Sequence, residues 1–81
     1  MSDERIKLRG RLAETEQKQQ ELFIRFRSTV TAIRGLLDPY ESPLALDVLG
    51  AADQMKILLE TQSAMADTTA LIERLKKDIG E

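Results

Sequence analysis

Apolar residues recur every three or four positions along two long segments of this chain, and one polar break separates the segments. Before the break the stripe runs from Leu8 and Leu12 to Ile33 and Leu37. After the break, positions spaced alternately by four and three residues are Leu44, Val48, Ala51, Met55, Leu58, Gln62, Met65, Thr69 and Ile72. This spacing predicts two amphipathic helices with coiled-coil-like packing. No segment alternates with a period of two, so we expect no strand.

The break lies at residues 38–43. Asp38 precedes a proline, which disfavours helical geometry at that position. Ser42 and Pro43 are typical of an N-cap followed by a first helical residue. Gly80 is typical of a helix C-terminus. We therefore expect an all-α single domain over residues 1–81, a long antiparallel helical hairpin with a helix at about 3–37, a turn at 38–43 and a helix at about 43–79.

Folding the chain back at Tyr40 pairs the two stripes position by position. The predicted pairs are Leu37 with Leu44, Ile33 with Val48, Val30 with Ala51, and Phe26 with Met55. The predicted interaction seam comprises Phe23, Phe26, Ile33, Val48, Met55, Leu58 and Leu59. In the same register Gln19 faces Gln62, which predicts a polar layer that fixes register and oligomeric state. The alternative is that the half far from the turn is simply looser and wetter than the half near it.

Several apolar residues flank the two paired stripes. They are Phe23, Ile24 and Leu36 in the first helix, and Leu46, Leu49, Ile57, Leu59, Leu71 and Leu75 in the second. A single hairpin would leave many of them in water, and large exposed apolar patches mark interfaces. We therefore expect a homo-oligomer, with a dimer forming a four-helix bundle favoured. An adaptor that binds a helix of another protein is the alternative.

Charge is distributed unevenly between the two segments. Residues 1–37 contain eight Lys/Arg and five Asp/Glu, a net charge of +3, whereas residues 38–81 contain four and nine, a net charge of −5. This asymmetry favours side-by-side helices or head-to-tail pairing between copies. The alternative is a small nucleic-acid-associated protein, whose phosphate contacts would come from Arg5, Lys7, Arg9, Arg11, Arg25, Arg27 and Arg34.

Two residue types that are frequent in active sites and metal sites are missing. The chain has no cysteine and no histidine, and it shows no nucleophile–base pair, glycine-rich phosphate loop or cluster of metal ligands. We therefore expect no enzyme activity and no cofactor or metal site. No apolar run approaches the ~20 residues of a membrane span, and residues 1–5 lack the apolar core of a secretory signal. We expect a cytoplasmic protein that does not bind membranes.

Two kinds of position allow two interpretations each. Tyr40, the only tyrosine, packs over the end of the hairpin or forms a recognition residue on an exposed tip. Gly35 and Gly50 let a neighbouring helix approach closely, or they are tolerated surface glycines that each cost about 1 kcal/mol relative to alanine.

The middle third of the chain carries a resemblance. The stretch Ile33-Arg34-Gly35-Leu36-Leu37-Asp38-Pro39, followed by a second helix rich in Ala, Leu and Glu, resembles small uncharacterised helical proteins encoded in Mu-like prophages. The resemblance implies a bacterial or phage origin, and it brings no catalytic residues with it. Taken together, the sequence predicts a non-enzymatic structural or interaction module that self-associates through apolar helical seams.

Overall fold

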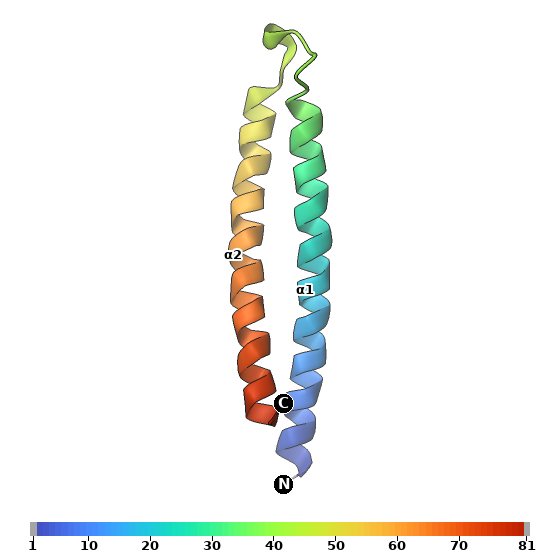
Figure 1. Ribbon diagram of the computed structural model, residues 1–81, viewed down its shortest axis with the longest axis vertical. Coiled ribbons are helices and arrows are strands. Elements are labelled where there is room, and N and C mark those ends of the chain that lie inside the picture. Colours follow the sequence, from blue (N-terminus) through green and yellow to red (C-terminus); the bar gives the residue numbers. More distant parts are fainter. Residues whose placement is uncertain (1, 81) are drawn as a thin grey trace.

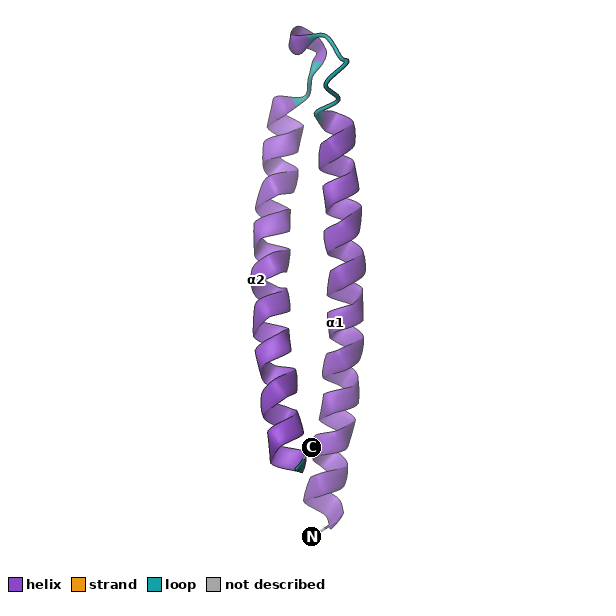
Figure 2. Cartoon of the chain, viewed as in Figure 1, coloured by secondary structure: helices purple, strands orange, loops and turns teal. Residues whose placement is uncertain are grey.

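The computed structural model describes residues 2–80 as two long antiparallel helices joined by a short connection (Figure 1). Helix α1 spans Ser2–Leu36 and helix α2 spans Val48–Ile79. A single 3-10 turn, η1 (Pro43–Ala45), lies in the connection, and no strand is present among the described residues (Figure 2). The extents are 64 × 15 × 14 Å. The predicted all-α hairpin is confirmed.

The hairpin is a rod and not a globule. Its radius of gyration is 18.3 Å, whereas a compact domain of this length would have about 12 Å. Each helix therefore has one neighbour within the chain, and a large part of its circumference faces solvent.

Helix α1 ends where the sequence predicts, and a tight turn follows it. The Tyr40 N–H donates to the Asp38 carboxylate at 2.9 Å, and the Glu41 N–H donates to the Asp38 carbonyl at 3.1 Å. An aspartate side chain that binds the backbone two residues onward is a common turn-forming device. Tyr40 is 95% exposed at this turn, so it does not pack over the hairpin end.

Helix α2 begins five residues later than predicted, and this is the main correction to the boundaries. Pro43–Ala45 make only one 3-10 turn, Ser42 provides no side-chain cap, and Leu46 is extended with ψ of 133°. Asp47 is the true N-cap, because its carboxylate accepts a 2.8 Å hydrogen bond from the Gly50 N–H. The connection therefore spans residues 37–47 and not 38–43.

The C-terminus of α2 agrees with the prediction. Gly80 has φ of +93° and its N–H lies 3.0 Å from the carbonyls of both Lys76 and Lys77. Glycine adopts this left-handed conformation without the steric penalty of a Cβ atom. The two lysines also place positive charge beside the negative end of the helix dipole.

Gly50 has a specific local role that the other helical glycines lack. A Cβ atom at Gly50 would clash with the capping carboxylate of Asp47, whereas a Cβ at Gly10 or Gly35 would meet nothing within 4 Å. This contact between Gly50 and Asp47 was not predicted from the sequence. The glycine makes room for the cap of its own helix.

Alanine substitution should separate these two kinds of glycine. We expect Gly10→Ala to raise the free energy of unfolding by up to about 1 kcal/mol, because it removes a flexible residue from an open helical site. Gly50→Ala should not raise the free energy of unfolding, because the loss of the Asp47 cap offsets the higher helix propensity of alanine. Urea denaturation followed by circular dichroism measures both. An equal gain at the two sites would contradict the assigned role of the Asp47 cap.

The tightest packing lies at the end of the hairpin far from the turn. Leu12 from α1 contacts Ile72, Leu75 and Ile79 from α2, and Leu8 and Leu71 pack against them. Leu75 is only 2% exposed. Near the turn, Ala51 is the one buried apolar residue among those described. The alternative prediction of a loose and wet far half is therefore wrong, because the more open half is the one near the turn.

Threonine is the principal buried polar residue of the seam. Thr15, Thr29, Thr61 and Thr68 are each 8% exposed or less. Their hydroxyls donate to the carbonyls four residues earlier at 2.7–2.8 Å. Each hydroxyl is therefore satisfied within its own helix, which leaves the methyl group to pack across the seam.

The register differs from the predicted one by about one heptad. The Gln19 amide donates to the Thr69 hydroxyl at 3.0 Å, seven residues further along α2 than the predicted partner Gln62, which is exposed. Leu44, the predicted partner of Leu37, is 99% exposed. The late start of α2 explains the shift, because the longer connection lets each residue of α1 meet a later residue of α2. The predicted Gln19–Gln62 layer is wrong.

Candidate interaction surface

The seam between the helices divides the hairpin into two long faces. Seam residues are buried or half-buried in most positions and recur with heptad spacing. In α1 they are Leu8, Leu12, Thr15, Gln19, Leu22, Phe26, Thr29, Ile33 and Leu36. In α2 they are Ala51, Gln54, Leu58, Thr61, Met65, Thr68, Ile72, Leu75 and Ile79. Residues that directly follow a seam position lie on one side of the seam. Residues that directly precede a seam position lie on the other side.

One face is apolar in the half near the turn. We define the apolar face as Phe23, Val30, Leu37, Val48, Met55 and Leu59. The first three recur at intervals of seven, each one position after a seam residue: Phe23 and Val30 belong to α1, and Leu37 is the residue directly after it. Helix α2 contributes Val48 and Met55, also seven apart, and Leu59 lies one helical turn after Met55. The heptad spacing therefore produces a second row of apolar residues beside the seam, along each half of the hairpin.

A shallow groove runs between the two rows. It has a volume of about 230 Å³ and is lined by Ile33, Leu37, Val48, Ala51, Ala52 and Met55. Leu37 is 42%, Met55 46% and Val48 60% exposed. These side chains lie on both walls of one depression, so a partner that fills it would cover both helices at once.

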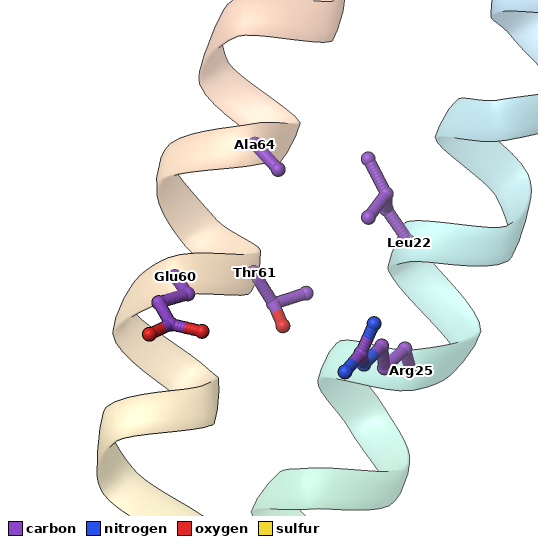
Figure 3. Close-up of a pocket in the computed structure, with 5 residues that line it drawn as sticks. All are labelled: Leu22, Arg25, Glu60, Thr61 and Ala64. Atoms are coloured by element: carbon purple, nitrogen blue, oxygen red, sulfur yellow. The ribbon is translucent and has the colours of Figure 1, made fainter.

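The opposite face is mixed in character. A depression of about 200 Å³ there is lined by Leu22, Arg25, Glu60, Thr61 and Ala64. Figure 3 shows Leu22 and Ala64 facing each other across the seam, with Arg25 and Thr61 approaching from opposite helices. Charged groups of both signs thus border this face, in contrast to the apolar face.

The predicted seam residues fall into two groups in the structure. Phe26, Ile33 and Leu58 are half-buried in the seam. Phe23, Val48, Met55 and Leu59 are exposed and belong to the apolar face. Thr61, Thr68 and Leu75 are seam positions that were not predicted. The signal was present, because the steps from Thr61 to Met65, Thr68, Ile72, Leu75 and Ile79 also alternate between four and three.

The seven basic residues predicted as possible phosphate contacts are all exposed, but they do not form one stripe. Arg27 and Arg34 lie three residues before Val30 and Leu37, which places them on the outer edge of the apolar face. Arg11 and Arg25 both precede seam residues and lie on the mixed face. The positive charge is therefore divided between the two sides of α1.

The described residues provide no metal centre and no membrane span. Across residues 2–80, no three side chains of His, Cys, Asp or Glu come together in a way that could hold a metal ion. Neither described helix combines the length and apolar character needed to cross a bilayer.

Comparison of the chain with protein-family models, with curated proteins and with solved structures finds no match. The resemblance to small proteins of Mu-like prophages stays a prediction.

Proposed function

We propose that this protein is a non-enzymatic structural or interaction module that self-associates through its apolar face. The observation that carries the proposal is the imbalance between buried and exposed apolar side chains. Among the residues whose burial is described, five apolar residues are buried, whereas ten large ones are exposed. Five of those ten, namely Phe23, Leu37, Val48, Met55 and Leu59, belong to one continuous face in the half near the turn.

The accessible surface of the chain supports this proposal. The isolated hairpin exposes 6457 Å², whereas a folded monomer of this mass would expose about 4,900 Å². The excess is about 1,600 Å², and a standard protein interface removes about 800 Å² from each partner. Pairing of two hairpins would therefore bring the exposed area per chain towards that of an ordinary folded protein.

A charge on the apolar face tests the proposal. We expect Met55→Glu to weaken self-association at least tenfold, because two carboxylates would be buried without partners in a symmetric interface. Ser63→Glu is the matched control, because Ser63 is exposed on the outer side of the same helix and should leave the assembly unchanged. Sedimentation equilibrium at micromolar concentration measures both, and circular dichroism checks that the helices remain.

A wild-type chain that sediments as a monomer at these concentrations would overturn self-association. If that monomer kept its helices, the adaptor that uses the same face for a helix of another protein would become the favoured function. Equal weakening by Met55→Glu and Ser63→Glu would instead show that the interface lies elsewhere on α2.

The nucleic-acid alternative predicts a different result. Phosphate-driven affinity is strongest at low salt, so fluorescence anisotropy of a labelled duplex at low salt is the sensitive measurement. Because the basic residues are divided between the two faces of α1, we expect the duplex not to bind at low salt. Binding that disappears as salt increases, and that Arg27→Gln with Arg34→Gln weakens, would favour the alternative.

A further inference from the structure

We propose that the occupant of the apolar face is a second copy of the hairpin, paired with both turns at the same end of the bundle. In this arrangement α1 of one copy lies antiparallel to α2 of the other. The inference rests on the proposed self-association and specifies its geometry. It follows from the positions of charge and apolar area around the face.

Two symmetric arrangements bring one apolar face onto another. A two-fold axis along the rod places both turns at the same end, with each α1 over the α2 of the second copy. A two-fold axis across the rod places the turns at opposite ends, with α1 over α1 and α2 over α2. Both are closed, self-complementary pairings, so burial of apolar area alone does not distinguish them.

Charge distinguishes them. Arg27 and Arg34 border the apolar face on α1 and are exposed. The opposite-end arrangement brings these two arginines against their own copies, and like charges held close together destabilise an interface. The same-end arrangement places them beside the outer edge of α2, which Ala52 and Leu59 form on this face. It also pairs the segment of net charge +3 with the segment of net charge −5.

The apolar rows of the two copies also meet in the same-end arrangement. Leu37, Val48 and Met55 line one groove within a single chain, and because seven residues of helix separate Val48 from Met55 by about 10 Å, Leu37 lies between them in height. A two-fold axis along the rod preserves height, so Leu37 of one copy lies against the row of Val48 and Met55 in the second. In the same way, Val30 lies against Met55 and Leu59. Neighbouring helices are antiparallel in both arrangements, as in an up-down four-helix bundle with short connections, so charge is what selects the same-end arrangement.

A distance between copies tests the arrangement directly. The chain has no cysteine, so a single introduced cysteine carries a unique spin label. Gly10 and Gly35 are suitable sites, because a Cβ atom at either meets nothing within 4 Å. Gly10 lies twenty residues from Val30 at the centre of the face, which corresponds to about 30 Å along the helix. Gly35 lies only five residues from Val30.

Double electron–electron resonance on Gly10→Cys gives the deciding measurement. The same-end arrangement keeps the two labels at one height and predicts a distance below about 40 Å, set by helices about 10 Å apart and by the label arms. The opposite-end arrangement predicts about 60 Å or more. Gly35→Cys is the control, because both arrangements predict a short distance for it.

Each result has a separate meaning. A short distance at both sites supports the same-end arrangement. A short distance at Gly35→Cys with a long one at Gly10→Cys overturns it but leaves self-association intact. Dipolar coupling at neither site, together with monomeric sedimentation of the unlabelled chain, overturns self-association itself.

Discussion

Replacing Leu75 with alanine is expected to lower the free energy of unfolding by about 2–5 kcal/mol. Leu75 is 2% exposed and is the largest fully buried side chain among those described. It lies in the cluster with Leu12, Ile72 and Ile79, so its removal leaves a cavity where the two helices pack most tightly. A chain of this size has only a few kcal/mol of stability in total. Thermal unfolding followed by circular dichroism should show the loss.

Leu59→Ala is the matched control for that experiment. It deletes the same side chain from the same helix, but Leu59 is 64% exposed in the single hairpin. At concentrations where the protein is monomeric, Leu59→Ala should cost less than about 1 kcal/mol, since little apolar area leaves contact. A small effect of Leu75→Ala would show that the terminal cluster does not hold the hairpin together.

Replacing Thr15, Thr29, Thr61 and Thr68 together by valine is expected to stabilise the hairpin by about 2–4 kcal/mol. Each hydroxyl is buried and bonds only to its own helix. Burying a hydroxyl costs free energy even when it is hydrogen-bonded locally, and each methyl that replaces one adds apolar contact in the seam. Urea denaturation at one fixed protein concentration measures the gain.

Thr31→Val provides the control for this substitution. Thr31 makes the same kind of bond, from its hydroxyl to the Arg27 carbonyl at 3.0 Å, but its side chain is exposed. We expect a change of less than about 0.5 kcal/mol there, as is usual for surface substitutions. An equal gain at Thr31 would mean that helix propensity, and not burial in the seam, accounts for the effect.

The helices and the location of the break could be predicted from the sequence, because helical periodicity and proline act locally. The start of α2 could not. Ser42-Pro43 and Asp47 are both acceptable helix starts by residue type, and the extended backbone at Leu46 decides between them. Capping preferences depend on residue type alone, so they do not determine whether Ser42 or Asp47 begins the helix.

The register was mispredicted for a related reason. A heptad repeat looks the same after a shift of seven residues, so Gln19 fits opposite Gln62 or opposite Thr69 equally well by pattern. Only the length of the connection determines which of these two registers forms. The seam positions on α2 were mispredicted because Met55 is more apolar than Gln54 and because the two buried threonines of α2, Thr61 and Thr68, are counted as polar. Apolar type favoured Met55 for the seam, whereas the structure places it on the apolar face.

The position of the terminal cluster has a consequence for how this chain reaches its folded state. The cluster joins Leu12 to Leu75, so the tightest contacts connect residues far apart in sequence. Closing such a long loop costs only about 1.5 kcal/mol more than closing a short turn. A transition state that forms at the turn alone would have little packing to stabilise it. Folding should therefore be cooperative, with the terminal contacts formed in its rate-limiting step and the turn completed afterwards.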